Sequence, residues 1–310
     1  MTALPTPLDR LPFPKIPTPP GTVHRRWGHR QNFPGANQER SGALAGTVRQ
    51  VTSPTDPHPT PAAPDSPTPT DHSAQHWDPA PDSAEIAAAT ARLLDTAHTL
   101  SDADVRAPSG LPGWSRGHVL AHIAGNADSL VNLLTWAATG VEHPQYGSSH
   151  EREAGIEAGA GDPIADQIAR LEASHQRFVD AVDRVPPENW HHLVRWMSGD
   201  PRPATKILDA RLREVAIHHL DLHAGYSASD WPVDFALRIL LSVLPAFESR
   251  GMAALTLLPT DLDSRISANG GSTIEVRGPT SALATWLLGR DDGSALSVSG
   301  GELPTPPSWG

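Results

Sequence analysis

The sequence predicts an α-helical four-helix bundle followed by a small α+β domain, with a proline-rich tail in front of both. Apolar residues recur at helical spacing between about residues 82 and 250, which is typical of amphipathic helices. Short strand-like segments separated by Gly and Asn replace this pattern after residue 251. We therefore expect a tail at 1–81, a bundle at 82–250 and an α+β domain at 251–310.

The tail holds 17 of the 32 prolines of the chain. A segment of this composition cannot bury enough apolar surface to offset the entropy lost on ordering, so we expect residues 1–81 to be disordered. We assign them no function.

Four amphipathic segments predict the bundle, and the serines that precede the first two can cap a helix. The four segments are 83–100, 115–134, 164–185 and 203–224. Asp162-Pro163 is expected to start the third helix, and Gly225 to end the fourth. Between the second and third helices, the Gly-rich polar stretch 140–161 is predicted to be a long loop, and such loops often cover a site.

The last part of the chain differs from the bundle in its pattern. An apolar helix at 235–247 is still assigned to the bundle. After it, the sequence predicts strands at 254–258, 264–267, 273–276 and 296–299, with a helix at 279–288. This mixture predicts a small α+β domain.

Composition excludes several classes of protein. The 310-residue chain has no cysteine, which excludes a disulfide scaffold, a thiolate zinc site and a cysteine nucleophile. Residues 1–50 carry a formal charge of +5 and the remainder −16, and an acidic globular part disfavours nucleic acid as a partner. No apolar run approaches the roughly 20 residues of a membrane-spanning helix. We expect a cytoplasmic monomer that binds neither membrane nor nucleic acid.

Two histidine-containing helices predict a metal site. Glu214 lies four residues before His218, so both side chains share one face of the fourth helix. On the second helix, His118 and His122 also share a face, and either could supply a third ligand. Two imidazoles and one carboxylate leave the fourth position of a tetrahedral zinc ion open, as in catalytic zinc sites.

The same stretches resemble a known family. GWSRGHVLAHIAGNAD (113–128) and RLREVAIHHLDL (211–222) are similar to the two metal-binding motifs of the mycothiol-dependent maleylpyruvate isomerases, which belong to the DinB-like superfamily of four-helix bundles. The segments VRGP (276–279), WLLGR (286–290) and LPTPPSW (303–309) resemble their C-terminal domain. The resemblance runs from about residue 82 to residue 310.

This resemblance implies a ligand set and an activity. It selects His122, which closes the Val-Leu-Ala-His motif, together with Glu214 and His218 as ligands of zinc. It implies that mycothiol, a low-molecular-weight thiol, supplies the sulfur that the chain lacks. The implied reaction is addition of the thiolate to the cis double bond of maleylpyruvate, rotation about the resulting single bond, and elimination.

The implied substrate is a dianion, so a cation is expected to hold one of its carboxylates. Arg290 is our candidate, with Arg116 and Arg213 as weaker ones and pairing with Asp291 or Asp292 as the structural alternative. Two other functions remain open. One is a mycothiol S-transferase that acts on another electrophile, and the other is a non-catalytic metal-binding protein.

Overall fold

The computed structural model describes residues 77–251 and 253–306. The predicted disorder covers residues 1–81, and residues 1–76 of this segment lie outside the described part. Residues 307–310, which include the last three residues of the segment 303–309, lie outside it as well.

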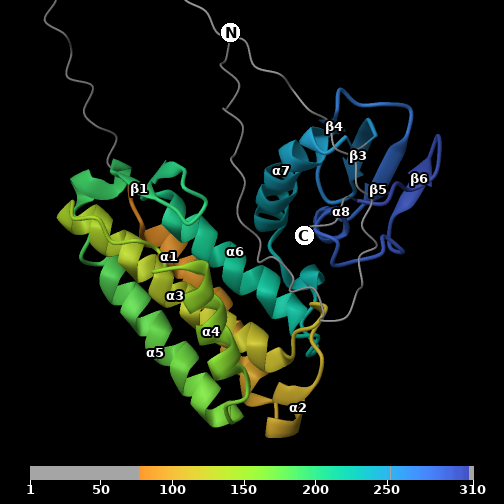
Figure 1. Ribbon diagram of the computed structural model, residues 1–310. Helices are drawn as coiled ribbons and strands as arrows, with labels where there is room; N and C mark the ends of the chain where they lie inside the picture. Colours follow the sequence, from red (N-terminus) through yellow and green to blue (C-terminus); the bar gives the residue numbers. More distant parts are fainter. Residues whose placement is uncertain (1–76, 252, 307–310) are drawn as a thin grey trace, which may run out of the picture. The chain divides into compact units, whose positions relative to one another are not determined.

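Four long helices form the bundle, as the sequence predicts. They are α1 (Ala80–His98), α3 (Arg116–Thr139), α5 (Ile164–Val182) and α6 (Lys206–Asp221). Helix α3 packs against both α5 and α6, and α1 closes the ring by contacting the same two helices (Figure 1). The predicted helical fold with a small C-terminal sheet is thus confirmed, and α3 and α6 are direct neighbours.

The core of the bundle consists of apolar side chains that recur at helical spacing. On α3 the buried residues include Val119, Leu120, Ile123, Leu130 and Leu133, none of which is measurably exposed. Fully burying such a side chain is worth about 1.5–3 kcal/mol relative to leaving it exposed, so this face strongly favours the observed packing of α3. Helices α1, α5 and α6 contribute similar rows of buried apolar side chains to the core.

Two helix starts differ from those predicted. Helix α1 begins at Ala80 rather than after Ser83, because prolines occupy its first positions and Asp78 Oδ1 accepts the Ala80 N–H at 3.0 Å. Helix α5 begins after Pro163, and its first N–H, that of Ile164, donates to Asp102 Oδ1. Asp102 opens the short helix α2 (Asp102–Arg106), so a side chain distant in sequence caps α5.

The stretch 140–161 contains a helix, so the prediction of a long loop is wrong for most of it. Helix α4 spans Ser149–Ala160 and packs against α3. Ser148 caps it by accepting the Glu151 N–H at 3.1 Å. The apolar spacing did not predict this helix, because the helix contains glycines and has only a weak apolar face.

The predicted cap of α3 is confirmed and includes a histidine. Ser115 Oγ accepts the His118 N–H, and His118 Nδ1 accepts the Ser115 N–H at 3.2 Å. This reciprocal pair satisfies two N–H groups that the first turn leaves without helical partners.

Replacing Ser115 with alanine is expected to lower the free energy of unfolding by about 1 kcal/mol, because the first turn loses its acceptor. Urea unfolding would measure the change. Ser115→Thr keeps a hydroxyl and should lose much less, so equal losses from both variants would contradict the capping role.

A short hairpin connects α5 to α6. The 3-10 helix η1 (Pro187–His191) leads into strands β1 (Leu193–Arg195) and β2 (Pro201–Pro203), which pair antiparallel. Trp190 and Trp196 of this segment are buried. The sequence pattern did not predict the hairpin.

The C-terminal part forms a four-stranded mixed sheet. Its strands, β3 (Leu255–Pro259), β4 (Ile266–Ala268), β5 (Glu275–Gly278) and β6 (Ser297–Ser299), lie in the order β4-β3-β5-β6. The pair β3–β5 is parallel and the two outer pairs are antiparallel. Helix α7 (Val233–Ser249) packs against α8 (Thr280–Leu287), which also contacts β3, β5 and the 3-10 helix η2 (Ala228–Asp230). The domain boundary at residue 251 stays a prediction.

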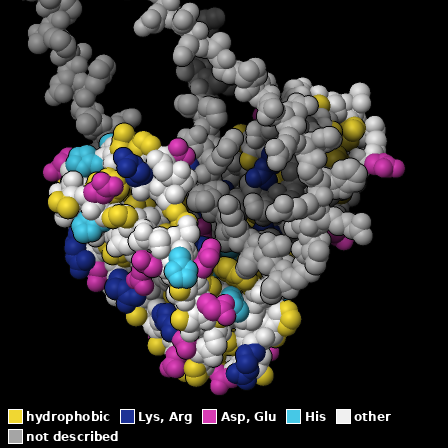
Figure 2. All heavy atoms as spheres, viewed as in Figure 1, with side chains coloured by type: hydrophobic (Ala, Val, Ile, Leu, Met, Phe, Trp, Pro, Cys, Tyr) yellow, Lys and Arg dark blue, Asp and Glu magenta, His cyan; other side chains and the backbone are white. Residues whose placement is uncertain are grey.

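Charged side chains of both signs are interspersed on the bundle face drawn in Figure 2, without one continuous basic patch among its described residues. None of the helices in the described part combines the length and apolar character needed to cross a membrane.

Candidate metal centre

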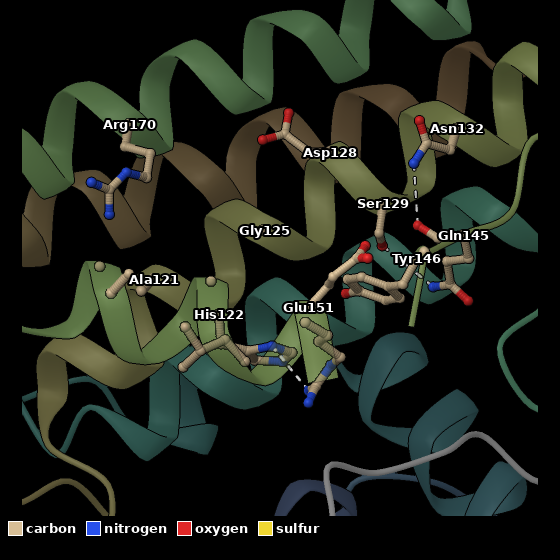
Figure 3. A pocket seen from close by; sticks show the side chains of 16 residues that line it. Ala121, His122, Gly125, Asp128, Ser129, Asn132, Gln145, Tyr146, Glu151 and Arg170 are labelled. Atoms are coloured by element: carbon tan, nitrogen blue, oxygen red, sulfur yellow. Dashed lines mark hydrogen bonds between the residues drawn. The ribbon is translucent and has the colours of Figure 1, made fainter. Parts of the chain in front are cut away.

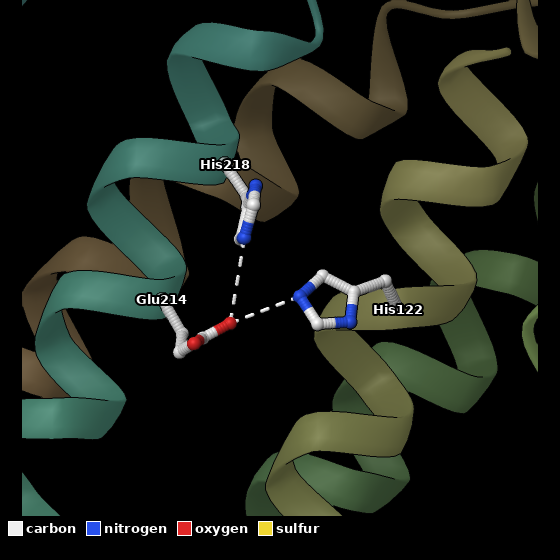
Figure 4. A group of neighbouring side chains, drawn as sticks. All are labelled: His122, Glu214 and His218. Carbon is white, nitrogen blue, oxygen red and sulfur yellow. Dashed lines mark hydrogen bonds and ion pairs between the residues drawn. The ribbon is translucent and has the colours of Figure 1, made fainter. Parts of the chain in front are cut away.

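The structure brings His122 of α3 together with Glu214 and His218 of α6 (Figure 4). His122 Nε2 lies 2.9 Å from Glu214 Oε2, and His218 Nε2 lies 3.4 Å from the same oxygen. One potential ligand atom of each residue lies within 4.8 Å of the other two. We call these three residues the His/Glu cluster.

Each member of the cluster is positioned by its helix. Glu214 and His218 are one helical turn apart, so α6 presents both on one side, as the sequence predicts. His122 comes from the middle of the buried face of α3, and the two imidazole rings meet edge to face with centroids 4.6 Å apart. Both histidines are 2–3% exposed, whereas Glu214 is partly exposed.

A buried arginine fixes the distance between the two ligand helices. Arg211 of α6 donates through Nη1 to Ile123 O at 2.7 Å and to Asn126 Oδ1 at 2.9 Å, both on α3. Ile123 follows His122 directly, and Arg211 precedes Glu214 by three residues. The side chain of Asn126 thus helps to hold Arg211.

His218 is oriented from behind by a carboxylate. Its Nδ1 lies 2.8 Å from Asp221 Oδ2, which leaves Nε2 directed at Glu214. Asp221 is 2% exposed and in turn accepts two bonds from Arg290, Nε to Oδ1 at 3.0 Å and Nη2 to Oδ2 at 3.2 Å. A carboxylate behind a metal-binding histidine is a common way to fix the ring and its tautomer.

Burial and the shared carboxylate shift the ionisation of the cluster. Burial lowers the pKa of His122 to about 4, against the raising effect of its hydrogen bond to Glu214. Burial also disfavours the charged form of His218, but its bonds to Asp221 and Glu214 raise its pKa to about 9. Burial would raise the pKa of Glu214, yet hydrogen bonds from both imidazoles hold it well below its usual range. The hydrogen bonds thus keep Glu214 ionised between the two histidine rings.

The donor set fits a zinc ion. Zinc accepts imidazole nitrogen and carboxylate oxygen, and three protein ligands leave one position for a further group. His122 and Glu214 belong to different helices, which Arg211 links by hydrogen bonds. His218 also has the supporting carboxylate that such ligands usually have.

Three other histidines near the cluster have different roles. His118 joins the cap of α3, and its Nε2 lies 3.1 Å from Glu157 Oε2. His219 is buried, stacked on Tyr226 and bonded to Thr96 Oγ1 at 2.7 Å. His223 is exposed and carries a positive φ of 49° just past α6.

The arginines named from the sequence lie around the site rather than in the pocket described below. Arg290 pairs with Asp221 rather than with Asp291 or Asp292, the structural alternative. Arg116 donates to Leu222 O and His223 O, and Arg213 lies 3.9 Å from Asp209.

A pocket of about 470 Å³ adjoins the cluster (Figure 3). Helix α3 lines it with His122, Gly125, Asp128 and Ser129, and a Cβ at Gly125 would meet no atom within 4 Å. The opposite wall comes from the segment predicted to be a loop and includes Gln145, Tyr146, Glu151 and Arg152. The sequence gives no residue-level signal for these positions; it shows only that the segment between the second and third helices is long enough to cover a site.

The comparisons with known proteins converge on one family. A family model described as the mycothiol maleylpyruvate isomerase N-terminal domain matches residues 86–223, which include the whole His/Glu cluster. Two crystal structures described as mycothiol-dependent maleylpyruvate isomerase, the second a point mutant, are similar to this chain with 29% and 28% sequence identity. Each match has a TM-score of 0.69, and the aligned region covers 74% of this chain and 97% of the chain in the crystal structure. A search of curated protein sequences gives no match.

Proposed function

We propose that this chain, which belongs to the mycothiol maleylpyruvate isomerase family, is a zinc- and mycothiol-dependent cis–trans isomerase of the maleylpyruvate class. The observation that carries the proposal is the His/Glu cluster, which lies within the segment that the family model matches and whose His122 lines a pocket. The proposed reaction is reversible addition of a thiol to the cis double bond of a small dianionic acid, with rotation before the thiol leaves.

His122, Glu214 and His218 are the proposed ligands of the ion. When bound, zinc would supply Lewis-acid activation and lower the pKa of a thiol at its open position. The thiol has to come from outside the polypeptide, because the chain has no cysteine.

The residues around the cluster have two proposed tasks. Asp221 holds the His218 ring so that Nε2 faces Glu214, and Arg211 keeps α3 and α6 at the spacing that the three ligands need. The buried positions of both imidazoles keep bulk water away from the ligand atoms, which strengthens electrostatic interactions there.

Arg290 has a proposed positioning role. Its Nε and Nη2 are bonded to Asp221, and its Nη1 donates to Leu288 O at 3.0 Å. Because these bonds fix the guanidinium, we propose that Arg290 acts on the site through Asp221 and His218. Action in the cytoplasm as a monomer remains a prediction from the sequence.

Metal analysis combined with a turnover assay on the full chain tests the proposal. We expect one zinc ion per chain and conversion of maleylpyruvate to fumarylpyruvate that requires both the metal and mycothiol. A chelator should abolish turnover, and added zinc should restore it.

The two alternatives predict other results in the same assay. A mycothiol S-transferase would consume a different electrophile with mycothiol and leave maleylpyruvate unchanged. A non-catalytic protein would bind the metal without any thiol-dependent turnover. Either result would contradict the isomerase assignment while keeping the metal site.

A further inference from the structure

Arg152 is the cation closest to the His/Glu cluster on the pocket side. It lies in α4, is half-buried and lines the pocket. Its Nη2 lies 3.3 Å from Nδ1 of His122, the bond drawn as a dashed line from His122 in Figure 3. Its guanidinium also lies over the Tyr146 ring, 5.9 Å from the centroid.

The charges around this pocket leave Arg152 without a carboxylate partner. Arg170, the other arginine in the lining, pairs with Asp162, and Asp128 pairs with Arg177 at 2.8 Å. Glu151 also lines the pocket, on an exposed position of α4. Within the described part of the chain, Arg152 has no carboxylate at ion-pair distance, so its charge is available to a ligand.

The hydrogen bond between Arg152 and His122 depends on the proton of the imidazole. Arginine only donates, so Nδ1 of His122 has to accept while Nε2–H donates to Glu214. A neutral imidazole that ligates a metal through Nε2 carries its proton on Nδ1. Both groups are then donors, and they need an acceptor between or beside them.

A carboxylate is the acceptor that fits. Its two oxygens can accept from the flat guanidinium and from Nδ1–H together, and charge-assisted bonds of this kind are the strong ones. Gly125, one turn beyond His122, lines the same pocket and leaves open space where a side chain would stand. The pocket therefore has room beside His122 for a small acid.

We propose that Arg152, with Nδ1–H of metal-bound His122, forms the recognition site for a carboxylate of the substrate. This rests on the proposed function for the metal but not for the reaction. The site selects small organic acids, and Arg152 rather than Arg290 contacts the substrate anion.

Calorimetric titration of the zinc-loaded full chain with succinate, a saturated dicarboxylate that cannot isomerise, tests this directly. We expect Arg152→Gln to weaken succinate binding at least tenfold while zinc content and the unfolding transition stay as in the wild type. Arg152→Lys keeps the positive charge but loses the paired N–H donors of the guanidinium, so its affinity for succinate should lie between those of the wild type and Arg152→Gln. Arg184→Gln, which removes an exposed arginine just beyond the end of α5, is the matched control and should bind like the wild type. Zinc-free protein should bind succinate several-fold more weakly.

Each of several results would overturn the inference: no succinate binding by the wild type, equal binding by Arg152→Gln, or an equal loss in Arg184→Gln. If Arg290→Gln lost succinate binding while retaining zinc, and Arg152→Gln bound succinate normally, Arg290 would be the residue that binds the carboxylate. If Arg152-dependent succinate binding is observed but thiol-dependent isomerisation is not, only the proposed reaction fails.

Discussion

Replacement of His122 by alanine is expected to remove most of the bound zinc. The variant keeps Glu214 and His218 on α6 but loses the ligand that comes from the second helix. Loss of a supporting residue behind a ligand typically costs 10–100-fold in metal affinity, so loss of the ligand itself should cost at least about 100-fold. Competition with a chromophoric chelator would measure the affinity, and thiol-dependent turnover should fall with it.

His118→Ala is the matched control, because His118 lies one turn earlier on the same helix. Its side chain joins the cap of α3 and contacts Glu157, so its loss should cost about 1 kcal/mol of stability and leave zinc affinity near that of the wild type. If both variants lost zinc equally, the assignment of His122 as the ligand would be wrong.

Arg290→Ala is expected to reduce both stability and metal affinity. It leaves the buried carboxylate of Asp221 with His218 as its remaining charged partner. Breaking a buried ion pair typically costs about 3–5 kcal/mol, and loosening the support of a ligand weakens metal binding roughly 10–100-fold. Urea unfolding and the chelator competition would measure the two effects.

Arg265→Ala removes an arginine whose pair with Glu275 is exposed, and it should cost no more than about 1 kcal/mol without changing zinc affinity. A positioning role for Arg290 also predicts that turnover recovers when zinc is added in excess. Normal zinc affinity with impaired turnover in Arg290→Ala would instead support direct contact with the substrate.

The bundle and one pair of ligands could be predicted from local sequence patterns. Helical periodicity identified the segments that became α3 and α6, and the spacing of four residues placed Glu214 beside His218. The same spacing could not separate His118 from His122, since both lie on one face of α3. A local feature does distinguish the two histidines. Ser115 lies three residues before His118 and forms a capping box with it, which leaves His122 as the candidate ligand.

Other parts of the site depend on contacts that no local pattern reveals. The bond of Arg290 to Asp221 joins residues far apart in the chain, so the sequence could suggest the arginine but not its partner. Arg152 was missed because α4 has little apolar periodicity, and its helix is apparent only from its packing on α3.

The bonds of Arg211 to α3 have a consequence for the stability of the bundle. Loss of this buried guanidinium would leave the Ile123 carbonyl and the Asn126 side-chain oxygen without their donor in the core. We therefore expect Arg211→Leu to lower the free energy of unfolding and to loosen the register of His122 against Glu214.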